Sequence, residues 1–506
     1  MEVVGALDNG TQSTRFIVYD SAARAVASAQ LEYAQHTPRP GWLEHDPQDL
    51  LATSRECIAK ALAAAQEAVG PVKVKAIGIT NQRETTIMWD RRTGQPLYNA
   101  VVWSDLRTQD ICEAMKAKHG GQDAFRDVTG LPISTYFSAF KARWLLDNVP
   151  AVAEAGDNLM FGTVDSWLIY HLTGGADGGV HVTDVSNASR TMLLELSSLT
   201  WSARMLEVFD LPAAMMPRLV SNAEVYGHVK DESSPLHGVP IAGCLGDQHA
   251  ALLGQRCTAG EAKNTYGTGC FMLLNTGPAC VASTHGLLST LAFKLGAAAA
   301  PQYALEGSIA VAGRGISWLK DNLGLLDSAK ESEAVAGSVE DTGGVYFVPA
   351  FSGLYAPHWR SDARGVLVGM TLATARGHVV RAMLEAICFQ TKEVLDAMQR
   401  DSGLKLTTLR VDGGATANAL LMQMQADLLG TPVLRPADQE STALGAALAA
   451  GLTVGMWDEA FVFRPEHEDS TASVFQPALS AEDVAPRYRR WQDAVQRSLG
   501  LADTGQ

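Results

Sequence analysis

Two short turns that carry glycine and threonine lie far apart in the sequence, and their recurrence constrains the fold more than any other feature. The first turn, residues 8–11, joins strand-like apolar segments at 3–7 and 14–19. The second, within residues 263–269, leads into an apolar run at 270–274. Two strands joined by such a tip form a β-hairpin. The repetition predicts two related halves, each presenting a turn of small residues to a shared cleft.

The length of 506 residues is too great for a single hydrophobic core and predicts two or three domains. Strand-like runs at 72–79 and 241–245 alternate with helical patterns at 49–69, 138–149, 165–172, 248–255 and 417–429, which indicates an α/β fold. No low-complexity linker divides the chain. We therefore expect domains at 1–254 and 255–506 that pack closely about a hinge, the second ending in a basic amphipathic helix at 485–499 that lies on the surface or docks on a partner.

The composition narrows the class of partner. A formal net charge of −15 argues against nucleic acid or an anionic membrane surface. No apolar run reaches membrane-spanning length, and residues 443–457, with three glycines, favour a closely packed internal helix. Seven cysteines without a C-x-x-C pair indicate a reducing compartment, so we expect a cytoplasmic protein. The sequence leaves the oligomeric state open, a homo-oligomer included.

An arginine and a glutamate stand side by side where the strand at 72–79 ends. Arg83 and Glu84 together offer five N–H donors and a carboxylate acceptor to one small polyol. Trp103 follows nineteen residues later and could wall the carbon skeleton of that ligand. The alternative is a surface ion pair of little energetic consequence.

Three glycine-rich corners, at Gly10, Gly267/Gly269 and Gly413/Gly414, are candidates for phosphate binding. Glycine lets a phosphate approach the backbone, and successive N–H groups form an anion-binding nest. Each corner alone could be an ordinary turn. The chain has no P-loop, no complete dinucleotide fingerprint and no protein-kinase motif set.

Two carboxylates suit phosphoryl transfer, which needs a proton acceptor and an anchor for Mg²⁺. Asp247, after the strand at 241–245, suits the base, and Asp8, at the first hairpin, suits the metal. The alternatives are a helix N-cap for Asp247 and a turn-forming role for Asp8. His249, beside a helix start, is interpreted as structural.

Several long motifs resemble the FGGY carbohydrate kinases. Residues 136–145 read Tyr-Phe-Ser-Ala-Phe-Lys-Ala-Arg-Trp-Leu and residues 365–385 correspond to a second signature. Within that family the sequence of these motifs is similar to that of members that phosphorylate glycerol, and around Ser352 and Tyr355 it is closer to that of eukaryotic members. Further matching stretches are 41–47, 80–89, 98–103, 187–192, 263–271 and 351–357.

The resemblance implies two RNase-H-like domains of the actin, hexokinase and heat-shock type around a hinged cleft, and transfer of the γ-phosphoryl group of ATP to glycerol with Mg²⁺. It implies glycerol contacts from Arg83, Glu84, Trp103, Tyr136, Asp247, Gln248 and Phe271, with Asp247 as the general base. It implies ATP contacts from Thr11, Gln12, Arg15, Gly267, Thr268, Gly313, Ser317, Gly414 and Asn418. It implies that Asp8 and Asp247 hold the metal.

Some positions depart from the family pattern. Gln12 stands where many members have threonine, Asn9 replaces a common glutamine, and Arg314 occupies a position where a small residue is usual. Residues 231–240 lack the arginine of the bacterial loop that binds a sugar bisphosphate, so we expect no inhibition by fructose 1,6-bisphosphate.

Two other functions stay open at this point. One is a kinase of another small polyol or sugar, such as xylulose or gluconate, against which the two aromatic walls argue. The other is a non-catalytic nucleotide-binding module, which would share the glycine corners but has no need of Arg83, Glu84 and Asp247.

Overall fold

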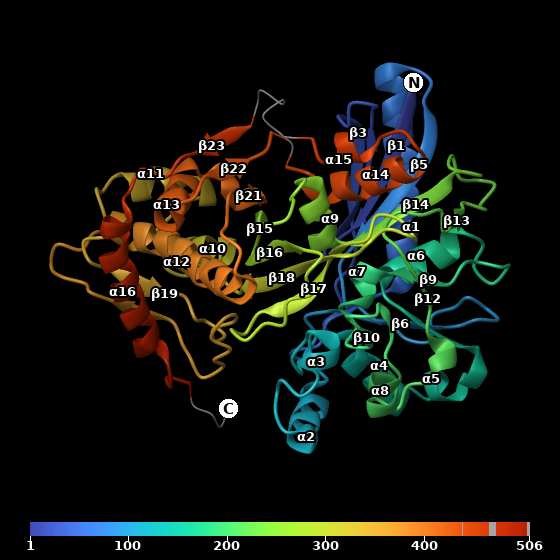
Figure 1. Ribbon diagram of the computed structural model, residues 1–506, viewed down its shortest axis with the longest axis horizontal. Helices are drawn as coiled ribbons and strands as arrows, with labels where there is room; N and C mark the ends of the chain where they lie inside the picture. The colour runs from blue at the N-terminus through green and yellow to red at the C-terminus, as the bar shows by residue number, and fades with distance from the viewer. Residues whose placement is uncertain (438, 465–471, 503–506) are drawn as a thin grey trace.

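The protein consists of two α/β lobes, each built on one large mixed sheet (Figure 1). The computed structural model describes residues 1–437, 439–464 and 472–502. The first lobe is drawn mainly in blue and green and the second in yellow, orange and red. The expected α/β fold with two related halves is confirmed by the strand orders below.

The first sheet has the strand order β13-β14-β5-β1-β2-β3. Its strands are β1 (Glu2–Asn9), β2 (Ser13–Tyr19), β3 (Ala25–Glu32), β5 (Lys73–Asn81), β13 (Gly227–His228) and β14 (Pro240–Gly246). Strands β1, β2 and β3 form an antiparallel meander, while β5 and β14 run parallel to β1. The predicted hairpin around residues 8–11 is therefore confirmed.

The second sheet has the order β17-β18-β16-β15-β21-β22-β23. Its strands are β15 (Ala262–Tyr266), β16 (Cys270–Gly277), β17 (Leu288–Phe293), β18 (Gln302–Ile309), β21 (Leu409–Asp412), β22 (Val433–Arg435) and β23 (Ser473–Phe475). Antiparallel β15, β16 and β18 are followed by the parallel strands β21 and β22. The core order β18-β16-β15-β21-β22 thus repeats β3-β2-β1-β5-β14.

Helices and small strands complete the first lobe. Helix α1 (Pro47–Val69) begins at a proline after Asp46, whose carboxylate accepts the Gln48 N–H at 2.8 Å. The other helices are α2 (Gln109–His119), α3 (Arg126–Thr129), α4 (Ser138–Asn148), α5 (Pro150–Glu154), α6 (Val164–Leu172), α7 (Val185–Ala188), α8 (Ala203–Val208) and α9 (Asp247–Gly254). The small strands are β4 (Glu44–His45), β6 (Ile87–Asp90), β7 (Ala100–Val101), β8 (Leu159–Gly162), β9 (Val182–Asp184), β10 (Leu194–Glu195), β11 (Thr200–Trp201) and β12 (Arg218–Val220).

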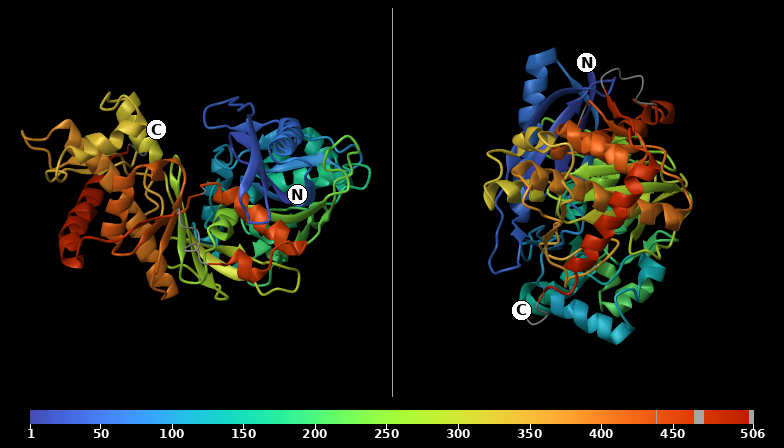
Figure 2. Two further views of the ribbon diagram at one scale, coloured as in Figure 1. Left: turned by 90° about the horizontal axis from the view of Figure 1, so that it is seen from above. Right: turned by 90° about the vertical axis from the view of Figure 1, so that its left-hand side faces the viewer.

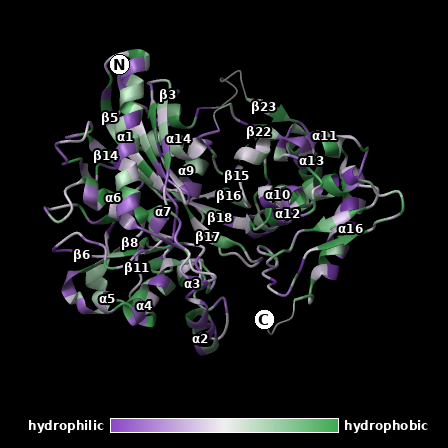
Figure 3. Ribbon diagram, turned by 180° about the vertical axis from the view of Figure 1, so that it is seen from behind, coloured by the Kyte–Doolittle hydropathy of each residue, from purple (hydrophilic) through white to green (hydrophobic). Residues whose placement is uncertain are grey.

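In the second lobe the long helix α12 (Arg376–Ser402) packs against the core of the sheet. The remaining elements of the second half of the chain are β19 (Tyr346–Val348), β20 (Val366–Val368), α10 (Gly313–Asp321), α11 (Ser332–Gly337), α13 (Ala419–Leu429), α14 (Ser441–Thr453), α15 (Glu459–Val462) and α16 (Ala481–Ser498). Helix α16 is the expected amphipathic helix, and hydrophilic and hydrophobic residues share its surface (Figure 3). Its apolar side is already occupied, since Trp491 is buried and stacks on Phe389 with ring centroids 5.3 Å apart.

Helix α14 crosses from the second half of the chain to the first lobe. It packs against α9 and against β1, β5 and β14. Orange-red helices accordingly lie among the blue and green elements in the view from above (Figure 2). The contact depends on glycine, because a Cβ on Gly445 would collide with the carbonyl of Ala250, and one on Gly254 with that of Ser441. The expected packed internal helix is confirmed.

The expected boundary between residues 254 and 255 stays a prediction. Residues of α14 share a hydrophobic cluster with β1 and α9, so this helix belongs to the first lobe by contact although it lies beyond the boundary in sequence. Within the described residues, no helix is long and apolar enough to cross a membrane.

Candidate active site

Strand register brings the candidate residues of the first lobe to one edge of the sheet. Asp8 lies opposite Thr80, and both Asn9 and Gly246 lie opposite Asn81. Because β1, β5 and β14 are parallel, their carboxyl ends meet there, where ligands of α/β sheets commonly bind. The second sheet repeats the arrangement, since Thr265 lies opposite Asp412 and the turns that follow both residues are glycine corners.

Arg83 lies in the interior and contacts two carboxylates. Its Nη1 and Nη2 atoms each donate to one oxygen of Glu306 at 2.8 Å, and its Nε lies 3.1 Å from Oδ1 of Asp247. The arginine side chain is 2% exposed and that of Glu306 is 1% exposed. The surface ion pair considered for Arg83 and Glu84 is therefore wrong, because these side chains pair with buried partners from elsewhere in the chain.

Glu84 is paired with Arg190, which follows helix α7. The Nε atom of Arg190 donates to Oε1 of Glu84 at 2.6 Å, and its Nη1 lies 3.3 Å from Glu306. Burial raises the pKa of Glu84, and the two arginines offset only part of that rise. Burial acts in the same direction on Glu306, but Arg190 and Arg83 outweigh it and hold the pKa of Glu306 below its usual range.

Aromatic rings lie next to this charged group, since the guanidinium of Arg190 lies 5.3 Å from the ring centroids of Tyr136 and of Phe137. The ring centroid of Trp103 lies 5.4 Å from that of Tyr136 and 6.4 Å from that of Phe271. The structure thus brings together the aromatic residues expected to wall a small polyol. Trp103 also donates from Nε1 to the Thr11 hydroxyl at 2.9 Å, which ties the aromatic wall to the first glycine turn.

A buried lysine holds the segment that carries Tyr136. The Lys141 ammonium donates to the backbone carbonyls of Thr135 at 2.8 Å and Tyr136 at 2.6 Å. Burial lowers the pKa of Lys141 to about 8. The lysine therefore satisfies carbonyl groups that would otherwise lack partners beside the ring of Tyr136.

The carboxylate of Asp247 is held through one oxygen. Its Oδ1 accepts from the backbone N–H of Gln248 at 2.7 Å and from Arg83. Gly246, not Asp247, is the N-cap of α9, so the N-cap alternative is wrong. The side chain is 30% exposed. Among the described residues no hydrogen bond or ion pair reaches Oδ2, so this oxygen is available to a ligand.

Gln248 is fixed by a residue of the second sheet. Lys263 in β15 donates to Oε1 of Gln248 and to the Thr265 hydroxyl, the latter at 3.0 Å. Burial lowers the pKa of Lys263 to about 8. With its carbonyl oxygen engaged in this way, Gln248 has its amide NH₂ group left to donate to a ligand.

Asp8 lies within β1 opposite Arg15, so it is a strand residue and not the turn-forming residue of the alternative. Burial and the charge of nearby Asp247 raise the pKa of Asp8 to about 7. Two carboxylates that repel one another are a set that a divalent cation would stabilise, and Mg²⁺ prefers such oxygen ligands. The residues present therefore fit the expected metal.

A cavity of about 590 Å³ lies in the second lobe between the glycine corners. Six residues expected to contact ATP line it, namely Gly267, Thr268, Gly313, Ser317, Gly414 and Asn418. Arg314 lines it as well, so this departure from the family pattern does face the cavity. The wall also contains Ser332 and Glu333 of α11, which the sequence analysis did not single out.

The other three residues expected to contact ATP come from the first lobe and do not line this cavity. The Thr11 hydroxyl already accepts from Trp103, while Gln12 is exposed. Arg15 pairs with Glu440, just before α14, and donates to Gln30 at 2.7 Å. Their expected contacts with ATP stay predictions.

His249 is buried beside the charged group. Its Nε2 lies 3.3 Å from the hydroxyl of Thr290, and burial together with Arg83 holds its pKa well below the usual range. A neutral buried histidine in this place agrees with the structural interpretation.

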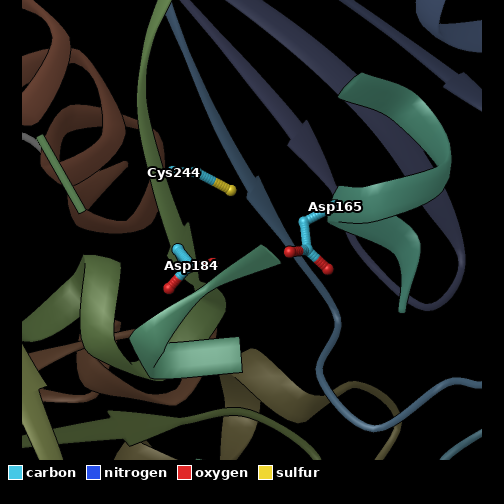
Figure 4. A group of neighbouring side chains, drawn as sticks. All are labelled: Asp165, Asp184 and Cys244. Carbon is cyan, nitrogen blue, oxygen red and sulfur yellow. The ribbon is translucent and has the colours of Figure 1, made fainter. Parts of the chain in front are cut away.

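A second acidic group lies deeper in the first lobe. Asp165, Asp184 and Cys244 converge from α6, β9 and β14 (Figure 4), with their ligand atoms within 4.8 Å of one another. Both carboxylates already accept hydrogen bonds from the protein. Asp165 accepts from two threonine hydroxyls, and Asp184 accepts from backbone and side-chain N–H groups of α7. The side-chain amide of Asn187 in turn donates to Oδ1 of Asn81 at 3.1 Å, so this network holds the last residue of β5 in place.

Sequence reasoning missed three residues that hold the candidate polyol-binding side chains in place. Arg190 and Lys263 stand in stretches that carry the family resemblance, which was the available signal, although neither received a role. Glu306 lies in an ordinary apolar strand pattern with no motif around it. Its importance is visible only from its contact with Arg83.

Two lobes with the same sheet order, a charged pocket at the strand ends of one and a glycine-walled cavity at those of the other, define the class of sugar kinases with the actin and hexokinase type of fold. Family models for the N-terminal and C-terminal domains of the FGGY family of carbohydrate kinases match residues 3–254 and 262–454. The chain belongs to the FGGY family of carbohydrate kinases.

Relatives of known name cover the whole chain. A glycerol kinase of Arabidopsis thaliana is 54% identical over 99% of this chain and 98% of its own length. A glycerol kinase of Methylorubrum extorquens is also 54% identical, over 99% of both chains. A plant and a bacterial relative are thus equally similar overall, and the eukaryotic wording is a local feature.

Solved structures agree with this assignment. The Plasmodium falciparum glycerol kinase with ADP matches with a TM-score of 0.92 at 41% identity, covering 99% of this chain and 98% of that chain. A xylulose kinase of Lactobacillus acidophilus matches with a TM-score of 0.85 at 21% identity, covering 99% of both chains. A gluconate kinase of the same organism matches with 0.84 at 21% identity, again over 99% of both. At that identity the last two show the fold alone.

Proposed function

We propose that this protein phosphorylates glycerol to glycerol 3-phosphate with ATP. The observation that carries the proposal is the acceptor pocket, which combines the paired charges of Arg83, Glu84 and Asp247 with an aromatic wall in which Trp103 and Phe271 meet edge to face, their ring centroids 6.4 Å apart. Charged donors and acceptors beside such a wall suit a short polyol, whose hydroxyls need both donors and acceptors. The full-length relatives named as glycerol kinases support the same substrate.

In the proposed reaction Asp247 is the general base. Its Oδ1 is held by Arg83 and by the backbone of Gln248, and Oδ2 accepts the proton of the attacked hydroxyl. The hydroxyl oxygen forms a bond to the γ-phosphorus, the bond from that phosphorus to the bridging oxygen breaks, and ADP leaves. The rings of Trp103 and Phe271 hold the carbons of glycerol so that one terminal hydroxyl faces Asp247.

Glycine-lined backbone would hold the nucleotide. The cavity of about 590 Å³ has Gly267, Gly313 and Gly414 in its wall, and at these positions a phosphate can approach the backbone without an intervening side chain. Asp8 and Asp247 would hold Mg²⁺, which when bound neutralises charge on the phosphates. Closure of the lobes would exclude water and thereby favour transfer to glycerol over hydrolysis.

We also place the protein in the cytoplasm, because all seven cysteines are free and six of them are buried. A kinase of another small polyol or sugar is the competing function, since xylulose and gluconate kinases share the fold. A longer acceptor would have to displace one of the two aromatic walls.

The test is release of ADP by the purified protein with Mg-ATP and glycerol, xylulose, gluconate or no acceptor. We expect turnover with glycerol alone. Turnover with a longer sugar would refute the acceptor assignment, and release without any acceptor would favour a nucleotide-binding module with ATPase activity. An Asp247→Asn variant should lose about 10³-fold in kcat, and full activity of that variant would refute the proposed base.

A further inference from the structure

Glu306 is a buried carboxylate of the second lobe that reaches into the acceptor pocket of the first. It lies in β18, opposite Leu273 of β16. Its side chain is 1% exposed, and both of its oxygens face arginines of the other lobe. A buried charge is expensive unless it is paired, so a carboxylate in this place constrains its partners strongly.

The pair between Glu306 and Arg83 has a defined geometry. The two terminal nitrogens of Arg83 each donate to a different oxygen of Glu306, both at 2.8 Å. Two parallel bonds between planar groups fix the orientation of the guanidinium plane. The remaining nitrogen, Nε, is thereby directed to Oδ1 of Asp247, 3.1 Å away.

We propose that Glu306 is a positioning residue for phosphoryl transfer. By engaging both terminal nitrogens of Arg83, it restricts that arginine to a single contact with Asp247 and leaves the second carboxylate oxygen for the acceptor hydroxyl. Because Glu306 comes from the second lobe, the base has its working orientation only while β18 holds Glu306 against Arg83. The inference rests on the proposed function for the identity of the reaction.

The balance of charge explains why a neutral replacement would matter. The buried group consists of Arg83, Arg190, Glu84 and Glu306, with Asp247 at its edge. Without the charge of Glu306, the two arginines have only Glu84 and Asp247 as counterions. Arg83 can then turn its fork onto Asp247, where it would occupy both oxygens and compete with the hydroxyl proton.

A merely structural role predicts something else. If the pair only held the lobes together, its loss would reduce stability and would affect glycerol and ATP alike. A positioning role predicts a lower kcat with little change in the KM for ATP, and a shift in the pH dependence of kcat.

The chain offers a matched control in Glu385 of α12. This carboxylate is also buried in the second lobe and also pairs with two arginines, Arg487 at 2.6 Å and Arg381 at 3.6 Å. It does not line the nucleotide cavity. A Glu385→Gln variant therefore removes an equivalent buried charge away from the acceptor pocket.

The experiment compares the parent protein with Glu306→Gln, Glu306→Asp and Glu385→Gln. For each, kcat and both KM values are measured from pH 5.5 to 9, and the Tm is recorded. For Glu306→Gln we expect kcat to fall about 100-fold, with the KM for ATP within about twofold and the acid limb of the kcat profile moved to lower pH, because Arg83 faces fewer anions.

Glu306→Asp keeps the charge on a shorter side chain, so its kcat should lie between those values with the acid limb in the parental position. This variant decides the question if Glu306→Gln does not fold. A Glu306→Gln protein with parental kcat would overturn the inference. So would an equal loss in Glu385→Gln with an equal fall in Tm, or a loss in Glu306→Asp that follows stability alone.

The measurements use whichever acceptor the parent phosphorylates. A parent active on another polyol refutes the glycerol assignment, while the comparison at Glu306 proceeds unchanged. A parent active on no acceptor refutes both proposals.

Discussion

The acceptor pocket and the nucleotide cavity are built from different parts of the chain. The pocket consists of side chains that are already bonded to one another, such as Arg83 to Glu306 and Glu84 to Arg190. The cavity, of about 590 Å³, has three glycines in its wall, at Gly267, Gly313 and Gly414. One site is a largely buried network of charges and the other is an open cavity with glycines in its wall.

The difference agrees with the ligands proposed for the two sites. Small polyols differ in the positions of their hydroxyl groups. A wrong ligand leaves buried polar groups of the site unpaired, which strongly penalises its binding. Phosphates are bound well by backbone N–H groups, which need close approach more than side-chain chemistry. Substitutions in the acceptor pocket should therefore act by breaking ion pairs between side chains. Substitutions in the nucleotide cavity should act by reducing the space that is left for the ligand.

Among the substitutions that test this comparison of the two sites, the largest effect is expected at Arg190. Replacing it by lysine leaves a single nitrogen to serve both Glu84 and Glu306, so the kcat/KM for glycerol should fall about 100-fold, or about 2.7 kcal/mol. The measurement is steady-state ADP release at varied glycerol.

The control for Arg190→Lys is Arg107→Lys. Arg107 is equally buried between Glu44 at 2.9 Å and Asp105 at 2.8 Å, but it stacks on Trp42 and has no contact with the pocket. The Arg107→Lys variant should be less stable than the parent protein and should keep the parental kcat/KM for glycerol. Equal catalytic losses in the two variants would contradict a special role for the charged group.

The next effect separates protein packing from ligand packing in the cavity. A Cβ at Gly313 would lie 2.7 Å from the carbonyl oxygen of Gly267, whereas one at Gly414 meets no protein atom within 4 Å. Both Gly313→Ala and Gly414→Ala should raise the KM for ATP about tenfold, but only Gly313→Ala should lower the Tm of the free protein. Unchanged KM values in both would refute the nucleotide assignment of the cavity.

An effect of similar size is expected at pH values below 7, through Asp8. Its pKa is raised to about 7, so the carboxyl becomes protonated as the pH falls through that value and ceases to be a ligand for Mg²⁺. The Mg²⁺ concentration for half-maximal activity should rise about tenfold between pH 8 and pH 6. A flat dependence, or an Asp8→Asn variant with the same dependence, would contradict this role.

Lys141 should have a milder effect, confined to the pocket. Lys141→Met leaves the carbonyls of Thr135 and Tyr136 without their donor, at a cost of about 1–3 kcal/mol of stability. We expect the KM for glycerol to rise about fivefold through displacement of the Tyr136 ring, with the KM for ATP unchanged. The exposed Lys60→Met is the control, and equal behaviour of the two would remove the link to Tyr136.

No effect at all is expected from fructose 1,6-bisphosphate. Residues 231–240 contain no arginine, and neighbouring Arg55 already lies 3.7 Å from Asp231. A dose–response of glycerol phosphorylation should stay flat. Strong inhibition at micromolar concentration would show that a segment outside both sites controls them.

Many of the strands and helices could be predicted from local sequence signals. The hairpin at residues 8–11 follows from alternating apolar residues and a glycine turn, and helix α1 follows from Asp46 and Pro47 at its start. The turn at residues 90–94 shows where local signals are not enough. Its arms meet only at isolated bridges such as Thr86 with Val101, because β6 pairs instead with β8, far along the chain.

By itself, the sequence determined the two-part α/β design, the family, the glycine corners and the positions of Arg83, Glu84 and Asp247, because turn chemistry and motifs are local and legible. The tertiary structure alone decided which partners these residues meet. Glu306 stands 223 positions from Arg83, and α14 returns to the first lobe through glycine contacts with α9. Such pairings depend on how two sheets and their helices pack in space, and a buried charge takes its meaning from the charge placed against it.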